Sequence, residues 1–453
     1  MNSVSGSGER KLGFWMVLAL VVGTFIGSGI FLLPAQLAPF GWNAVLGWGI
    51  TISGALCVAT IFAALARALP RAAGPYAYVG EAFGRLPAFV VAWSYWISIW
   101  VGNAAIATAA VSYSSVFAPA LADVPGAGAA AAVAILWVLT AINATSLRAG
   151  GGIQLVTVLI KIVPLLVVIV IAAVVLGEGR PTAAPAFAAS EISLSSVNTA
   201  AALTLWALLG FEAASIGARN VRNPARNVPR ATIIGTLIVG AIYLLTATPV
   251  TMFLPSEAVA NSNAPFALFV GEYWNPAAGS LIAAFAAISA IGALNGLVLI
   301  SGEFPLALAR GGTFPRWFAA ISPRGIAVRA QILSSALATL LIAANYSRSL
   351  AGLFAFMALL ATAAALVLYF ACSLSALRLQ RSGVLPRSAG IAALAALGLL
   401  YSVWTMYGAG GEATGWGAVL LAAGVAVYFI MTRIVRSSPE PAADPAAPPE
   451  PAA

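Results

Sequence analysis

A glycine-rich stretch, Gly23-Thr24-Phe25-Ile26-Gly27-Ser28-Gly29-Ile30-Phe31, lies in the middle of an apolar run from Leu12 to about Ala38. The run is long enough to cross a bilayer core of roughly 30 Å at about 1.5 Å per residue. Its glycines, serine and threonine are poor helix formers, however. Two interpretations are open: a face of small residues that packs against another helix, or a helix broken in mid-membrane. A broken helix would offer carbonyl and N–H groups that can bind the ammonium and carboxylate of an amino acid.

The composition indicates a membrane protein that crosses the bilayer many times. The 453 residues are 61% hydrophobic and only 8% charged, and the mean hydropathy is +0.98, which no soluble core of this length needs. The near-continuous apolar pattern predicts helices, not the alternating strands of a membrane barrel. Twelve spans are expected, at about 12–37, 43–66, 86–118, 127–145, 151–177, 194–217, 231–254, 277–309, 326–344, 350–377, 389–409 and 415–432.

The net charge of +9 reflects topology and not a nucleic-acid partner. With the N-terminus inside, almost all Lys and Arg residues fall in inner segments, while the outer segments hold only Arg180 and Arg348. This asymmetry predicts that both termini are cytoplasmic, and we expect a multi-pass protein of the bacterial inner membrane. The chain contains no histidine, and Cys57 and Cys372 lie inside spans. We therefore expect no disulfide, no metal site, no cofactor and no enzyme activity.

The chain divides into a transport core between two tails. Residues 1–11 are expected to form a cytoplasmic tail, and residues 12–380 a core of ten helices. Residues 381–436 hold two accessory helices without deep polar residues, and residues 437–453, rich in Pro, Ala and acid, are expected to be disordered. The segment from Arg67 to Arg85 predicts a short element packed at the inner mouth, with a plain loop as the alternative.

Two polar residues fall deep in spans. Asn103 shares a helix face with Trp96 and Trp100, and it could contact a substrate or form a hydrogen bond between helices. Lys161 is the one lysine within a span, where insertion costs at least about 2.5 kcal/mol, so a partner is expected. The alternative is a lysine whose stem extends to the membrane surface.

A second interruption lies in the sixth span, where Trp206 to Leu209 is followed by Gly210-Phe211-Glu212. Paired breaks five spans apart are typical of an inverted repeat of five plus five helices. Burial favours the neutral form of Glu212, which could serve packing, gating or proton transfer.

Four motifs together resemble the amino acid–polyamine–organocation transporters: GSGIFLLPAQLAPFG, WSYWISIWVGN, LTLWALLGFEAAS and RNPARNVPRA. The chain looks most similar to the basic amino acid/polyamine antiporter branch, which includes the bacterial arginine/agmatine antiporters. The resemblance implies a LeuT-like all-α fold, with discontinuous helices 1 and 6, two inverted repeats and two accessory helices. It also implies an amino acid or amine substrate, and commonly a homodimer.

Site residues follow from the same resemblance. The substrate carboxylate would meet Ser28 and Gly29. The α-ammonium would meet the backbone carbonyls of Phe25, Trp206 and Leu209. Asn103 would reach the substrate side chain, Trp206 would cover the site, and Tyr95 and Glu212 would form gating hydrogen bonds.

Two positions depart from the arginine/agmatine pattern. Leu297 replaces the tryptophan that stacks on guanidinium, and Ala358 replaces a serine near it. Lys161 matches a lysine that occupies the place of a sodium ion in related carriers. We therefore expect exchange or proton-coupled transport of neutral or varied L-amino acids, with Lys161 as the coupling residue. The alternative is an arginine/agmatine or other basic amino acid/polyamine antiporter, and a remote one is a non-transporting sensor.

Overall fold

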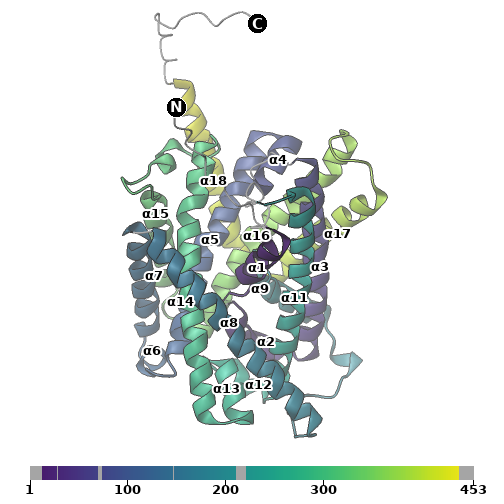
Figure 1. Ribbon diagram of the computed structural model, residues 1–453, viewed down its shortest axis with the longest axis vertical. Coiled ribbons are helices and arrows are strands. Elements are labelled where there is room, and N and C mark those ends of the chain that lie inside the picture. Colours follow the sequence, from purple (N-terminus) through teal and green to yellow (C-terminus); the bar gives the residue numbers. More distant parts are fainter. Residues whose placement is uncertain (1–12, 28, 70–73, 146, 211–220, 438–453) are drawn as a thin grey trace, which may run out of the picture.

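A computed structural model describes residues 13–27, 29–69, 74–145, 147–210 and 221–437. The described chain is built from helices (Figure 1). In order they are α1 (Phe14–Phe25), α2 (Gly29–Leu37), η1 (Ala38–Phe40), α3 (Trp42–Ala68), α4 (Pro75–Phe83), α5 (Arg85–Ser114), α6 (Ala120–Asp123), α7 (Ala127–Thr145), α8 (Leu147–Gly177), η2 (Ala189–Glu191), α9 (Leu194–Ala207), α11 (Pro224–Met252), α12 (Ser256–Ala260), α13 (Pro265–Tyr273), α14 (Pro276–Arg310), η4 (Arg316–Ala319), α15 (Val328–Ala344), α16 (Leu350–Arg381), α17 (Ala389–Gly408) and α18 (Gly410–Ser437).

Within the described residues, 9 helices are long and apolar enough to cross a membrane: α3, α5, α7, α8, α11, α14, α16, α17 and α18. This agrees with the predicted polytopic membrane protein. The other three predicted spans correspond to shorter helices. The first is divided into α1 and α2, the sixth contains α9, and the ninth is α15. The count of twelve spans therefore stays a prediction.

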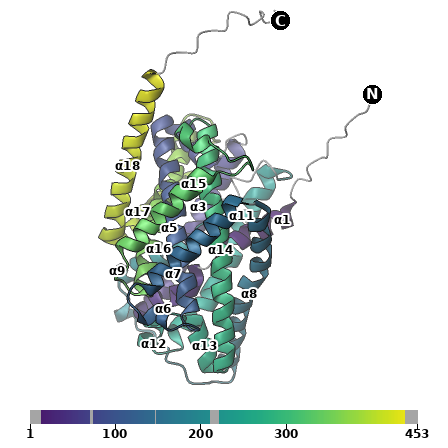
Figure 2. The same cartoon turned by 90° about the vertical axis from the view of Figure 1, so that its left-hand side faces the viewer.

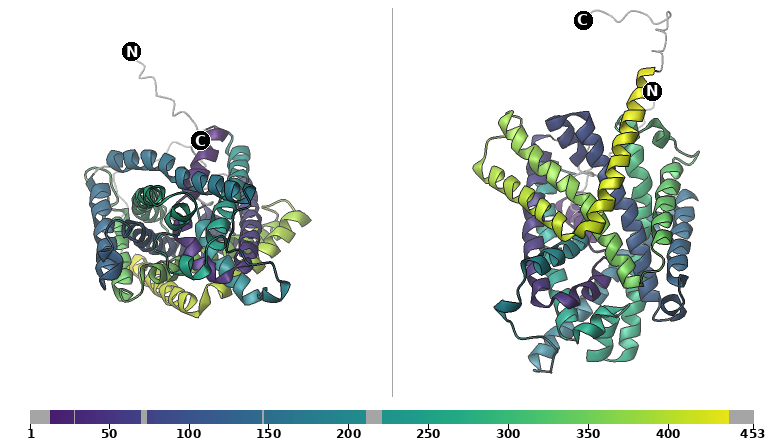
Figure 3. Two further views of the ribbon diagram at one scale, coloured as in Figure 1. Left: turned by 90° about the horizontal axis from the view of Figure 1, so that it is seen from below. Right: turned by 180° about the vertical axis from the view of Figure 1, so that it is seen from behind.

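The centre of the bundle is formed by α5 and α16. In their span segments 83% and 78% of residues are buried, against only 11% in α18. Every residue of α5 from Trp96 to Tyr113 is buried, so all sides of the helix are covered, as expected of a helix enclosed by others. Figures 2 and 3 show α18 along one flank of the bundle, so α18 adds to the periphery and not to the core.

The two ends of the bundle carry different short helices (Figure 1). At one end lies α4, the element predicted between Arg67 and Arg85, and it packs against α5 and α16. The Arg378 guanidinium of α16 donates to the Ala82 carbonyl at 2.7 Å, which suits the negative end of a helix dipole. At the other end lie α6, α12 and α13, which the span pattern did not predict.

Close packing between α3 and α9 holds the end of α9 in place. A Cβ atom built on Gly47 would lie 2.8 Å from the Ala200 Cβ, so only glycine permits this approach. One turn further along, the hydroxyls of Thr51 and Thr204 are 2.7 Å apart. These contacts fix the register of the last turn of α9, which carries Trp206.

Candidate functional site

The helix break at mid-bundle is present between α1 and α2. The last α-helical hydrogen bond of this turn runs from Ile26 N–H to the Val22 carbonyl, at 3.0 Å. The next N–H, that of Gly27, turns back to the Phe25 carbonyl at 2.7 Å. The carbonyl of Gly23, four residues before Gly27, is therefore left without its helical partner. Ser28 lies outside the described residues.

Lys161 of α8 supplies the missing partner. Its Nζ donates to the Gly23 carbonyl at 3.2 Å. Of the side chains that the structure describes, Lys161 is the only charged one that is buried, with 2% exposed. Its stem thus extends inward to the break and not outward to the membrane surface. The ammonium meets the partial negative charge that the end of a helix carries, which partly offsets its desolvation.

Trp206 packs at the end of α9 between two glycines. A Cβ built on Gly29 would lie 2.7 Å from the indole Nε1, and one built on Gly102 would lie 3.4 Å from Cη2 of the same ring. The ring also meets Phe354 edge to face, with centroids 6.4 Å apart. Trp206 is only 8% exposed. Glycine at position 29 therefore creates the space that the indole fills, whereas a Cβ at position 102 would stand in ordinary contact with the ring.

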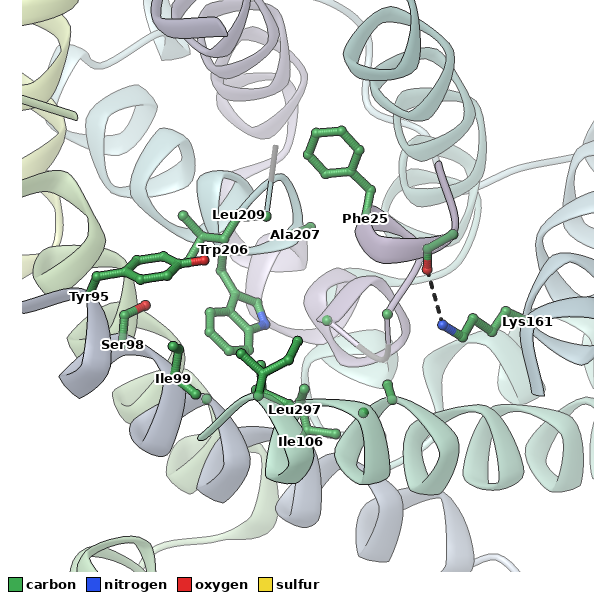
Figure 4. A pocket seen from close by; sticks show the side chains of 18 residues that line it. Phe25, Tyr95, Ser98, Ile99, Ile106, Lys161, Trp206, Ala207, Leu209 and Leu297 are labelled. Atoms are coloured by element: carbon green, nitrogen blue, oxygen red, sulfur yellow. Dashed lines mark hydrogen bonds between the residues drawn. The ribbon is translucent and has the colours of Figure 1, made fainter. Parts of the chain in front are cut away.

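A cavity of about 210 Å³ lies beside this ring, far above the roughly 10–15 Å³ that one water molecule needs. Figure 4 shows Trp206 and Leu297 on one side of it and Lys161 on the other. The lining comes from α1 and the break (Gly23, Phe25, Gly27, Gly29), α5 (Tyr95, Ser98, Ile99, Gly102, Ile106), α8 (Lys161), the end of α9 (Trp206, Ala207, Leu209, Gly210) and α14 (Ala293, Gly296, Leu297, Ile300). The two predicted interruptions thus meet at one cavity.

Seven of the predicted site residues line this cavity: Phe25, Gly29, Tyr95, Lys161, Trp206, Leu209 and Leu297. Two do not: Ala358 and Asn103 are absent from its wall, and both side chains are fully buried. Glu212 lies outside the described residues. The roles of all these residues stay predictions.

The cavity face of α5 differs from the face that the sequence singled out. It is formed by Tyr95, Ile99, Gly102 and Ile106, which recur at helical spacing. Asn103 follows Gly102 by one residue, hence by about 100° around the helix. Its neighbour by spacing, Trp96, donates its indole N–H to the Ser334 hydroxyl of α15 at 3.0 Å. The Trp96 face therefore packs on other helices, and the face of α5 that carries Tyr95 lines the cavity.

The Phe25 carbonyl, a predicted acceptor for the substrate ammonium, already has partners. The Tyr243 hydroxyl of α11 donates to it at 2.7 Å, in addition to Gly27 N–H at 2.7 Å. A carbonyl oxygen has two lone pairs, so both are engaged. Tyr243 is fully buried and is a site-shaping residue that sequence patterns did not indicate.

Tyr95 forms the wall of the cavity at one side. Its ring meets Phe304 of α14 edge to face, with centroids 5.1 Å apart, and Phe304 meets Tyr76 of α4 at 6.3 Å. These three rings run from the cavity toward α4. A gating role for Tyr95 would therefore involve α4 and α14.

Comparisons with known proteins agree with this architecture. A family profile described as amino acid permease matches residues 12–435. The chain is 34% identical to a cadaverine/lysine antiporter of Escherichia coli (strain K12), over 74% of this chain and 75% of that one. It is 30% identical to the putrescine transporter PotE of Haemophilus influenzae, over 93% of this chain and 97% of that one. Both the family and these relatives are transporters. With its apolar helices and its cavity at a helix break, the chain is a multi-pass membrane protein that belongs to the amino acid permease family, within the amino acid–polyamine–organocation superfamily.

Proposed function

We propose that the chain is a secondary antiporter of the bacterial inner membrane that exchanges a basic amino acid, of the lysine type, for an aliphatic diamine. The observation that carries this proposal is the cavity where the α1–α2 break meets the end of α9. The similarity of the chain to a cadaverine/lysine antiporter and to a putrescine transporter supports the substrate class.

The cavity wall supports an aliphatic cation. Ile99, Ile106, Leu297 and Ile300 present apolar surface against which a polymethylene chain can pack, at about 0.8 kcal/mol per buried CH₂. Carbonyl groups at the break can accept from an ammonium group. Lysine and the diamines combine these two features, a methylene chain and terminal ammonium groups.

The expectation of a neutral or varied L-amino acid is not supported by these relatives, which favour the basic amino acid/polyamine alternative. The expectation depended on Leu297, which offers no aromatic face to a guanidinium. That reasoning applies to arginine and agmatine alone. An ammonium on a methylene chain needs acceptors and apolar contact but no stacking ring, so Leu297 is compatible with lysine and its diamine.

Several finer features belong to the same proposal. Twelve spans in a five-plus-five inverted repeat, with both termini cytoplasmic and helices 1 and 6 discontinuous, would allow alternating access to the cavity. Ser28 and Gly29 would bind a carboxylate, with ammonium groups at the carbonyls of Phe25, Trp206 and Leu209. Lys161 would couple exchange to protons through its contact with Gly23.

The test is counterflow in proteoliposomes that hold the full-length chain. We expect that unlabelled lysine or cadaverine inside the vesicles drives uptake of labelled lysine, and that this uptake saturates with the internal concentration. Excess external leucine or alanine should not compete with labelled lysine. Competition by leucine as strong as by lysine would overturn the substrate class. Binding of lysine without exchange would indicate a sensor instead of a carrier.

A further inference from the structure

The indole N–H of Trp206 is a buried donor without a partner among the described residues. Its Nε1 is shielded from solvent and has no hydrogen-bond acceptor in reach, and the residue is 8% exposed. A buried donor that lacks an acceptor costs about 1–3 kcal/mol. Trp48 and Trp100 have unpartnered indole donors as well, but of these three only Trp206 lines the cavity, where a ligand can supply the acceptor.

The position of this N–H indicates the charge of that ligand. The indole Nε1 lies against Gly29, the first residue of α2, so closely that an added Cβ would stand 2.7 Å from it. The nine-residue helix α2 begins there, and its first-turn N–H groups have no intrahelical acceptors. In Figure 4 the indole nitrogen faces the interior between Trp206 and Lys161. Helix N-terminus and indole N–H thus present donors to the same place, which suits an anion.

We propose that the Trp206 indole N–H donates to the carboxylate of a bound amino acid at the start of α2, and so distinguishes the amino acid from its decarboxylated amine. This inference rests on the proposed exchange function. Lysine and cadaverine differ only by the carboxylate, so they share the methylene chain and the terminal ammonium contacts. Only lysine has a carboxylate that can accept from the Trp206 indole N–H, and bound cadaverine leaves that N–H unpaired.

A packing role for Trp206 predicts a different pattern. The ring packs closely against Gly29 and meets Phe354 edge to face, so its loss would loosen the cavity for every ligand. Packing loss would therefore weaken lysine and cadaverine equally. The ratio of the two affinities separates hydrogen bonding from packing.

The experiment measures dissociation constants of lysine and cadaverine for the purified full-length chain and for Trp206→Phe. We expect the variant to weaken lysine by at least about tenfold more than cadaverine, since hydrogen bonds to charged groups are strong. Trp100→Phe is the matched control. Trp100 is also buried with an unpartnered Nε1 but does not line the cavity, so the affinity ratio should not change. Equal weakening of both ligands by Trp206→Phe would overturn the inference and leave the exchange function intact.

A second measurement needs no substitution. With ¹⁵N-labelled tryptophan in the unmodified chain, lysine should move one indole N–H resonance downfield and cadaverine should leave it in place. Saturating lysine that moves no indole resonance would overturn the inference. If neither lysine nor cadaverine binds the unmodified chain, the proposed exchange function fails, and this inference fails with it.

Discussion

Gly29→Ala offers a direct test of how tightly the cavity is built. The added Cβ would stand 2.7 Å from Trp206 Nε1, whereas ordinary contacts begin near 3.4 Å. The indole must therefore retreat by about 0.7 Å. It cannot do so freely, because the Trp206 side chain is only 8% exposed and its ring meets Phe354 edge to face. Overpacking of this kind costs about 1–3 kcal/mol, which corresponds to roughly five- to 150-fold in affinity if the displacement falls on the ligand site.

The assay is a paired measurement of lysine affinity and melting temperature on purified protein. We expect lysine to bind at least about fivefold more weakly, since the indole moves off the start of α2. Gly49→Ala in α3 is the control, because a Cβ there meets nothing within 4 Å. That control should leave affinity unchanged and raise stability by up to about 1 kcal/mol. Lysine affinity within twofold of the unmodified chain in Gly29→Ala would refute the reasoning.

Three further substitutions test other parts of the site. Lys161→Ala removes the partner of the Gly23 carbonyl, and its uptake should lose the response to an imposed proton gradient; an unmodified chain that ignores such a gradient would contradict the coupling role. Leu297→Trp should improve arginine binding by up to roughly thirtyfold, since a cation–π contact contributes about 0.5–2 kcal/mol, and competition assays with arginine and lysine measure this. Tyr243→Phe should lower the free energy of unfolding by about 0.5–1.5 kcal/mol and bind lysine equally or more tightly, because the Phe25 carbonyl regains a free lone pair; weaker binding in calorimetry would contradict this.

The helix break was one of two interpretations of the glycine-rich stretch, because Gly27 and Gly29 favour either a break or a packing face in a long apolar run. The structure ends α1 at Phe25, which agrees with the break. The sequence also predicted that Lys161 has a partner, since a lysine deep in a span needs one. It did not predict which group that partner is, because the Gly23 carbonyl becomes free to accept only once Gly27 N–H turns away from it.

Long-range contacts and short helices escaped prediction for other reasons. Tyr243 reaches Phe25 across 218 residues of sequence, and nothing in its own span marks it as different from a core tyrosine. The helix α13 is only nine residues long, so no span-length apolar pattern marks it. Asn103 was singled out by its polarity, yet polarity does not reveal which side of α5 faces the cavity. Leu297 lines the cavity, but the sequence alone did not indicate which substrate class it suits, and the polyamine relatives did.

The engaged carbonyl of Phe25 has a consequence for how ligands arrive. Because Tyr243 and Gly27 already use both lone pairs, an ammonium that binds there replaces a hydrogen bond instead of adding one. The net gain in hydrogen-bond energy is then small. If the displaced donor is Tyr243, α11 loses a link to α1 at the moment of occupancy. Binding of a cation at this one oxygen would thus weaken the attachment of α11 to α1, while the close packing of Gly235 against Val21 would remain.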